Sequence, residues 1–224
     1  MIYRKVSRSV VRVFATLLCL AGVHCPGQEG RQDHTCTVDG SGSFAVAKGQ
    51  DGHNFESGWG VRTGGGFAFT PIPRRQGFSG YLTANYMYEQ LGATTAALNN
   101  AKMLNPTQLS TATSARGSFS AVTIDPIVRF AVSRRLGFYG SGGFGWFRRG
   151  VVFNGANPAN LIQSSSTSLD RLASNSGAFD LGGGANIGMT RNGGLMIFTE
   201  IRLYKGAAIN SGTKLLPLSV GVRW

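Results

Sequence analysis

The sequence is poor in charge and contains no long hydrophobic run. Only 14% of its 224 residues are charged, against about 25% in an average soluble domain. No apolar stretch approaches the roughly 20 residues of a membrane-spanning helix, which excludes a helical membrane protein. Aromatic residues still make up 10% of the chain, which disfavours a disordered protein. The glycines follow no Gly-X-Y repeat, which excludes collagen.

The first 27 residues have the pattern of a secretory signal peptide. Four basic residues precede an apolar run over 13–23, and the first 27 residues contain no acidic residue. The small residues Cys25 and Gly27 suit the positions before a cleavage site, so we expect cleavage before Gln28. Removal of the four basic residues lowers the formal net charge from +12 to +8. The alternative is a buried N-terminal helix.

Cysteine and histidine are scarce in the expected mature chain. Cys36 is then the only cysteine, so no disulfide framework within the chain is expected. His34 and His53 belong to no ligand-spaced group, so no metal site is predicted. The glycine-rich runs lack the Lys-Ser/Thr of a phosphate-binding loop. We therefore expect no cofactor.

Glycine, by contrast, is abundant, and most of the chain alternates between apolar and polar or small residues. This period of two is typical of β-strands, whose successive side chains point to opposite faces. In 194–204, for example, Ile197 and Ile201 alternate with Glu200 and Arg202. The pattern predicts eight strands, or seven if the weak first one is omitted. They are 37–47, 57–70, 78–90, 117–132, 135–149, 176–189, 194–204 and 214–224.

The polar faces of these strands carry equal numbers of acidic and basic residues. A soluble barrel or sandwich turns its apolar face inward, whereas a membrane barrel turns it toward lipid. The balance of charge favours a closed polar interior, because an unpaired buried charge is costly. We therefore predict a polar network in the lumen of a membrane barrel. Its members are Arg62, Glu89, Asp125, Arg129, Asp180, Glu200, Arg202 and Arg223.

The connections between the strands alternate in length. Segments 91–116 and 150–175 are long, whereas 133–134 and 190–193 are short. Outer-membrane barrels have short periplasmic turns and longer outer loops. The alternation is the one expected of a barrel whose N-terminus lies in the periplasm. The two long connections are rich in Ala, Asn, Ser and Thr, so we expect solvated loops from Ala93 to Ser114 and from Asn154 to Asn175.

Two prolines fall inside predicted strands. Pro126 lies in the middle of 117–132, and Pro217 lies in the last strand. Each removes a backbone donor from the ladder, and a closed barrel has no free edge to accommodate the loss. We expect a bulge or a bend at each proline.

The C-terminus is the most specific local signal. The last strand ends in an aromatic residue, and its outward positions are Leu218, Val220, Val222 and Trp224. Together with phrases such as "LGFYGSGGFGWFRR" and "LLPLSVGVRW", this ending resembles the small eight-stranded bacterial outer-membrane β-barrel superfamily, which includes the transmembrane domain of outer-membrane protein A. In that superfamily such a strand is recognised by the barrel-assembly machinery, so the resemblance implies this role for the four residues.

The resemblance and the strand pattern predict an all-β fold. This fold is an eight-stranded antiparallel up-and-down transmembrane β-barrel that follows a cleaved signal peptide. The expected divisions are a signal peptide over 1–27, a short segment over 28–36 and the barrel over 37–224. The resemblance implies an integral outer-membrane location, contact with outer-membrane lipids and a monomer.

The sequence offers few candidates for catalytic or ligand-binding residues at the outer rim. Some barrels of this superfamily remodel lipid A with a His and a Ser, but His53 has only the ordinary turn residues Asp51 and Ser57 near it in sequence. We therefore expect no catalysis. Arg148 and Arg149 are candidates for binding lipopolysaccharide phosphates. The alternative for this pair is plain snorkelling at the interface.

The sequence thus predicts a structural, anchoring or surface-interaction role with a lumen plugged by polar residues. The first alternative is a small-solute channel that uses the same residues as a filter. The second is a secreted soluble β-barrel that binds an apolar ligand. Nucleic-acid binding is not expected, because an exported chain without a recognised motif has no basis for it.

Overall fold

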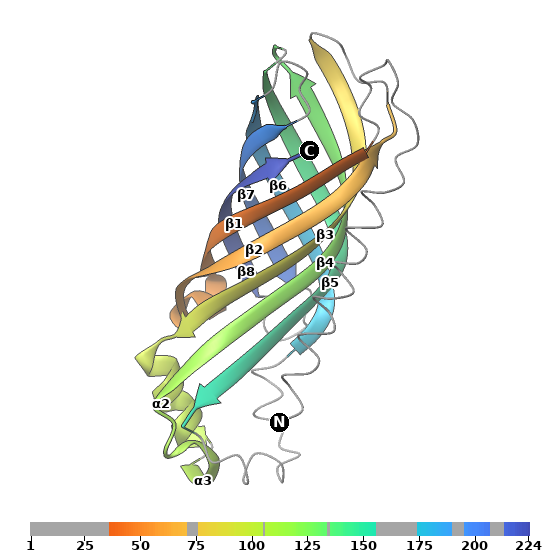
Figure 1. Cartoon of the computed structure of the whole chain (residues 1–224). Helices are drawn as coiled ribbons and strands as arrows, with labels where there is room; N and C mark the ends of the chain where they lie inside the picture. The colour runs from red at the N-terminus through yellow and green to blue at the C-terminus, as the bar shows by residue number, and fades with distance from the viewer. Residues whose placement is uncertain are drawn as a thin grey trace.

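The computed structural model describes residues 36–70, 76–104, 106–133, 135–155, 174–189, 195–206 and 213–224. The strands in this part of the chain form one closed antiparallel barrel of eight strands (Figure 1). They follow one another around the wall in sequence order, and the first pairs with the last. Their bounds are β1 Cys36–Lys48, β2 Phe55–Ala68, β3 Gly77–Ala93, β4 Ser114–Ala131, β5 Leu136–Asn154, β6 Ser174–Gly188, β7 Met196–Gly206 and β8 Lys214–Arg223.

The predicted fold class is confirmed, including its weakest strand. β1 pairs with β2 along one edge and with β8 along the other, so it closes the barrel. The signal peptide and its cleavage site lie outside the described residues. We call the end of the barrel that carries the helices the helix end, and the opposite end, with the start of β1 and the close of β8, the terminal end (Figure 1).

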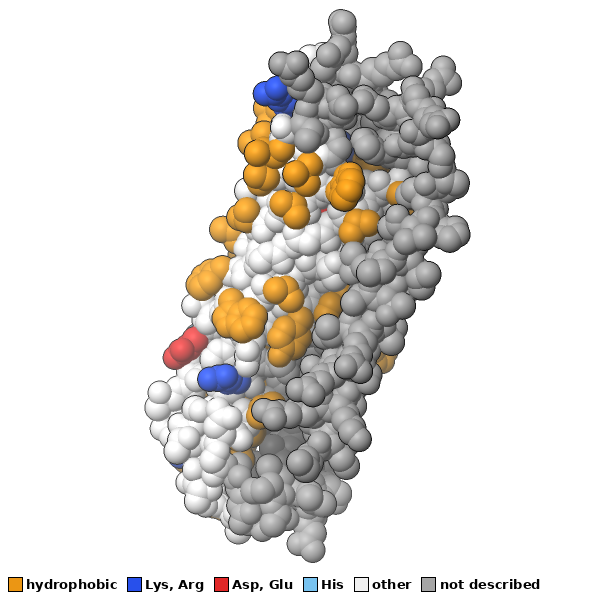
Figure 2. Space-filling model, viewed as in Figure 1, with side chains coloured by type: hydrophobic (Ala, Val, Ile, Leu, Met, Phe, Trp, Pro, Cys, Tyr) orange, Lys and Arg blue, Asp and Glu red, His pale blue; other side chains and the backbone are white. Residues whose placement is uncertain are grey.

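The outer wall is apolar, as Figure 2 shows for one face. Alternate residues of every strand point outward, and large hydrophobic side chains at these positions are exposed. A soluble barrel has the opposite arrangement, so this wall is the lipid-facing surface of a membrane barrel. No helix among the described residues combines the length and hydropathy needed to cross a membrane. The exposed side chains include Phe44, Trp59, Phe67, Phe78, Val128, Phe144, Trp146, Phe179, Leu181, Ile201, Leu218 and Trp224.

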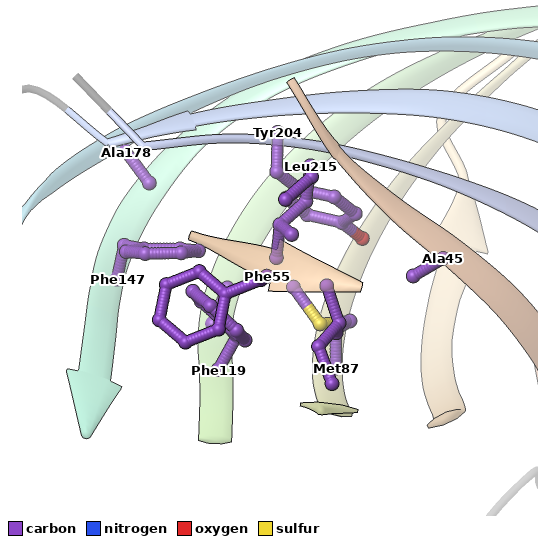
Figure 3. Close-up of a cluster of buried hydrophobic side chains, with 11 residues drawn as sticks. Ala45, Phe55, Met87, Phe119, Phe147, Ala178, Tyr204 and Leu215 are labelled. Atoms are coloured by element: carbon purple, nitrogen blue, oxygen red, sulfur yellow. The ribbon is translucent and has the colours of Figure 1, made fainter. Parts of the chain in front are cut away.

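The interior is layered along the barrel axis. The inward residues of β7 run from Phe198 through Glu200 and Arg202 to Tyr204, and all of them are buried. Phe198 belongs to a small apolar cluster at the terminal end, and Tyr204 belongs to a larger one toward the helix end (Figure 3). Glu200 and Arg202 therefore lie between two apolar layers. The larger cluster contains Phe55, Met87, Leu91, Phe119, Phe147 and Leu215 beside Tyr204.

The connection after β3 differs from the solvated loop that we expected. It contains the helices α2 (Thr95–Leu104) and α3 (Pro106–Leu109). Thr94 Oγ1 accepts a hydrogen bond from the Ala97 backbone N–H at 3.2 Å, which caps the start of α2. Leu98 is buried against Leu109 and against the start of β4, so the segment packs onto the barrel instead of extending into solvent. Most of the second expected loop lies outside the described residues.

The two strand prolines do not produce the bulges that we expected. Between β4 and β5, pairing runs from Ile124 opposite Phe144 to Ile127 opposite Ser141, so the register is the same on both sides of Pro126. Pro217 keeps its place opposite Ala45. Each proline thus removes a backbone hydrogen-bond donor only at its own position, and the residue pairs on both sides keep the strands in register. The one register irregularity among the described ladders lies elsewhere, between the start of β2 and β3.

The helix η1 (Gly49–His53) joins β1 to β2 at the helix end. The strands beside α2 and α3 are the longest of the barrel. β4 has 18 residues and β5 has 19, whereas β8 has 10. Figure 1 shows β3, β4 and β5 continuing beyond the other strands at this end, with α2 and α3 attached to them. The barrel therefore carries a one-sided projection.

Candidate functional site: the charged lumen

Arg202 is the centre of the charged layer. Its guanidinium binds Asp125 of β4 through Nη1, and the same nitrogen donates to Asp180 of β6 at 3.0 Å. Its Nη2 donates to Ser141 of β5 at 3.0 Å, and its Nε donates to Glu200 at 2.5 Å. Arg202 is 1% exposed. One cation thus joins the walls of four strands.

Glu200 connects this centre to the other side of the barrel. Its two oxygens accept from Nη1 and Nη2 of Arg62 at 2.8 and 3.2 Å. The Tyr139 hydroxyl donates to Glu200 Oε2 at 2.7 Å. Paired nitrogen donors and a phenol satisfy the carboxylate in a place where water is excluded. Glu200 therefore needs no solvent to remain buried.

Asp39 extends the network to the first and last strands. It lies 3.4 Å from Arg223 of β8 and 3.8 Å from Arg62, measured between nitrogen and oxygen. The Arg223 guanidinium also lies 4.9 Å from the ring centroids of Tyr139 and Phe198, within the range of cation–π attraction. The prediction missed Asp39, although its position between Val38 and Gly40 in an alternating strand would have placed it inside.

β3 joins the network through an amide. Asn85 Nδ2 donates to Asp125 Oδ2 at 2.6 Å and to Thr83 Oγ1 at 3.0 Å. All eight strands therefore contribute to one connected set of hydrogen bonds and ion pairs. Glycines make the space for it: a methyl group at Gly64 would overlap the Asn85 side chain, and one at Gly143 would overlap Asp125.

Two predicted members lie apart from this set. Arg129 is half-buried near the terminal end. With the Asn186 amide turned so that its oxygen faces Arg129, that oxygen accepts from Arg129 Nη2 at 3.1 Å. Glu89 is fully buried on β3, where its Oε1 accepts from Ser43 Oγ at 2.6 Å. Glu89 forms no ion pair with a described residue, and its Oε2 has no hydrogen-bond partner among them.

The structure separates the two rim arginines. Arg148 is exposed on the outward face of β5, whereas Arg149 is 4% exposed inside the barrel and donates to Thr213 Oγ1 at 3.1 Å. Consecutive residues of a strand face opposite sides. β5 continues to Asn154, so Arg149 belongs to the lumen and not to the rim. The expected contact of Arg149 with lipopolysaccharide is therefore wrong in its geometry.

The four residues predicted to form the assembly signal lie on the outward face of β8 and at its end. Leu218, Val220, Val222 and Trp224 are 57%, 56%, 52% and 74% exposed. The backbone of Trp224 still belongs to the barrel, because it exchanges two hydrogen bonds with Val38 at 2.7 and 2.8 Å. These four side chains thus form an apolar strip on the outer wall.

Chemically, the lumen is a buried set of charges in which acids and bases are equal in number. Asp39 and Arg149 add one acid and one base to the predicted set, so the lumen holds equal numbers of both. Desolvation cancels much of the attraction within buried ion pairs of this kind. Removing one member of a pair, however, leaves the other as an unpaired charge that water cannot reach. In the described part of the chain, no group of His, Cys, Asp and Glu is arranged to hold a metal ion.

Comparison with known proteins gives the same fold. No protein-family model matches the sequence, and no curated protein matches it. Neisserial surface protein A is similar in structure, with a TM-score of 0.53 and 16% identity over 84% of this chain and 95% of that one. Ail of Yersinia pestis (TM-score 0.47, 10% identity, 84% and 97% covered) and the outer membrane enzyme PagL (0.44, 14%, 83% and 97%) are more distant. The chain has the fold of the small outer-membrane β-barrels.

Proposed function

We propose that this protein is an integral outer-membrane barrel that anchors a surface-exposed projection, and that its lumen is closed to solutes. The apolar wall, the closed antiparallel sheet and the fold shared with Neisserial surface protein A support insertion into that membrane. A closed barrel satisfies every backbone group without water, which lipid demands.

The observation that carries the closed lumen is the network to which all eight strands contribute. Arg202 and Glu200 reach residues of β2, β4, β5 and β6 across the interior. Apolar layers around Phe198 and Phe119 cover the network on both sides. A solute would have to break several buried ion pairs and displace packed side chains to pass.

The projection at the helix end supports a role in surface interaction. α2 and α3 pack on the extended ends of β4 and β5, so this part has a defined shape. Met103 and Leu104, at the end of α2, are 73% and 72% exposed. We propose that the helix end faces the cell exterior and that the projection is the contact element. Arg148 remains our candidate for contact with lipopolysaccharide.

We also propose that the barrel has no catalytic activity. His53, the one histidine among the described residues, is exposed in η1. The polar cluster of the described structure is instead the buried lumen, where ion pairs occupy the carboxylates of Asp39, Asp125, Asp180 and Glu200. A substrate has no access to these groups.

Current recording across planar lipid bilayers tests the closed lumen. Purified, refolded protein is compared with an open porin reconstituted in the same way. We expect no steady conductance steps from this protein. Large and stable steps would contradict the proposal and favour the small-solute channel.

Surface labelling tests the orientation. In intact cells, a bulky polyethylene-glycol maleimide should label Met103→Cys in a Cys36→Ser background. The natural Cys36, which is exposed at the start of β1, is the matched control and should react only after the cells are opened. Labelling of Cys36 but not of Met103→Cys in intact cells would reverse the orientation.

A further inference from the structure

Three lysines form a row on the outer wall at the helix end. Lys214 of β8 pairs directly with Lys48 of β1 on one side and with Lys205 of β7 on the other. All three side chains are exposed on the outward face of their strands. Directly paired residues of antiparallel strands lie about 4.5–5.5 Å apart between Cα atoms. Three ammonium groups are thus held side by side by the register of the barrel.

This arrangement lacks a counter-charge within the described structure. None of the three lysines has a carboxylate within ion-pair distance among the described residues. Like charges directly opposite one another destabilise a sheet. The row therefore costs stability unless an anion from outside the described chain neutralises it.

The row lies at the border of the lipid-facing wall toward the helix end. Two residues deeper on the same strands are the apolar Val46, Leu203 and Leu216, and the next strand places Phe179 opposite Lys205. Long lysine stems can lie along such a surface while their heads reach the polar layer. The three ammonium groups are thus at the depth of lipid headgroups.

The other outward-facing charges at the helix end are mostly positive as well. Among the described residues, the outward charges toward the helix end include one acid, Glu56, against five bases. An excess of one sign at a membrane border favours an anionic leaflet. The five bases are Lys48, Arg116, Arg148, Lys205 and Lys214.

We infer that Lys48, Lys205 and Lys214 form a site for the phosphate groups of an anionic lipid, with the lipid A part of lipopolysaccharide as the partner whose chemistry fits. Lysine is a flexible point charge that binds phosphate, and three adjacent heads match a headgroup with more than one phosphate. The inference rests on the proposed function, because it requires the helix end to lie in the outer leaflet. It assigns the lipid to this row on β7, β8 and β1, on a different part of the wall from Arg148.

Binding of lipid A tests the site. The triple variant K48Q/K205Q/K214Q and the wild type are refolded in detergent, and bound lipid A is counted by native mass spectrometry over a concentration series. Each lysine near an anionic surface contributes about a factor of five, so we expect affinity to fall on the order of 100-fold. The matched control K102Q/R116Q/R135Q removes as many charges elsewhere, from α2, from β4 and from the turn before β5, and should stay within about fivefold of the wild type. Equal losses in the two variants would overturn the site.

Inorganic phosphate distinguishes the two sources of the anion. A lipid site also depends on the acyl chains beside the apolar wall, so millimolar inorganic phosphate should not displace lipid A. Displacement at that concentration would show a site for free phosphate and would overturn the lipid assignment.

A stability measurement separates ligand binding from a structural role. Lys214→Gln removes the central charge, and hence both direct repulsions. In vesicles of phosphatidylcholine alone, we expect this variant to unfold at a higher urea concentration than the wild type. In vesicles that also contain lipid A, we expect the order to reverse. The same order in both lipids would contradict the inference.

The two proposals fail in different ways. A folded membrane barrel migrates differently on gels before and after boiling, and this shift does not depend on the three lysines. If the wild type lacks the shift and stays in the soluble fraction, the proposed function fails. If the shift is present in all variants but lipid A binding is unchanged, only the lysine site is refuted.

Discussion

Arg202 Nε donates to Glu200 Oε1 at 2.5 Å, although the two residues are neighbours on the same face of one strand. Arg202 also forms ion pairs with Asp125 and Asp180, and Glu200 also forms an ion pair with Arg62. β7 therefore supplies both signs to the centre of the lumen. Loss of Arg202 leaves Asp125 and Asp180 without their cation, and loss of Glu200 leaves Arg62 with the more distant Asp39, 3.8 Å away.

Arg202→Met should strongly destabilise the barrel. The substitution keeps an unbranched side chain but leaves Asp125, Asp180 and Glu200 buried without their shared cation. Removing one partner of a buried pair typically costs about 3–5 kcal/mol. Urea unfolding in lipid vesicles, followed by the gel-mobility shift, measures the loss. Arg148→Met, on the exposed face, is the control and should change stability by at most about 0.5 kcal/mol. Similar values for the two variants would refute the central role of Arg202.

Glu89→Gln should stabilise the protein at neutral pH. Glu89 is fully buried and Ser43 is its one hydrogen-bond partner among the described residues, so its charge is poorly compensated. The amide keeps the shape and an acceptor oxygen for Ser43. We expect a higher urea midpoint at neutral pH and a smaller gain in acid, where the wild-type carboxyl is neutral as well.

Glu200→Gln is the contrasting variant for this experiment. Glu200 is paired with Arg62 and Arg202, so its neutralisation should lower the urea midpoint at neutral pH. Destabilisation by Glu89→Gln at every pH would show that the Glu89 carboxylate has a stabilising partner.

The barrel could be predicted from the sequence because alternation determines which side chains face lipid. Glu200 and Arg202 are predicted to face the lumen because they alternate with the outward-facing Ile201, and the burial pattern of β7 confirms this placement. The partners could not be predicted in this way. Which carboxylate meets Arg202 depends on the tilt and stagger of the closed sheet, and these bring together residues such as Asp125 and Arg202 that are 77 positions apart.

Two errors come from strand ends, where the pattern is weakest. The sequence placed the end of β5 at Arg149, but the strand continues to Asn154 and turns the Arg149 side chain into the lumen. α2 was missed because its composition, rich in Ala, Asn and Thr, resembles a loop. Thr94 as a cap, followed by Leu98 facing the barrel, was the local signal that could have identified it.

Ile201→Arg tests the lipid-facing wall. Ile201 is 51% exposed on the outward face of β7, between the inward Glu200 and Arg202. Arginine on the lipid side of a barrel costs about 2–4 kcal/mol near the bilayer midplane. We expect the variant to lose the boiled-against-unboiled gel shift in the membrane fraction, whereas Ile201→Leu keeps it. Normal assembly of Ile201→Arg would place this position outside the bilayer.

Trp224→Ala should slow assembly in cells more than it weakens the finished barrel. The side chain is 74% exposed, so it packs little in the folded state, and its backbone bonds to Val38 do not require it. If the end of β8 is the signal for the assembly machinery, the rate at which newly made protein acquires the gel shift should fall several-fold. The urea midpoint of refolded protein should change little. Leu181→Ala, at a similarly exposed position outside β8 (69%), is the control and should affect neither quantity strongly. Equal assembly rates for Trp224→Ala and Leu181→Ala would remove the special role of the C-terminal residue, and a large loss of refolded stability would show that Trp224 serves the fold itself.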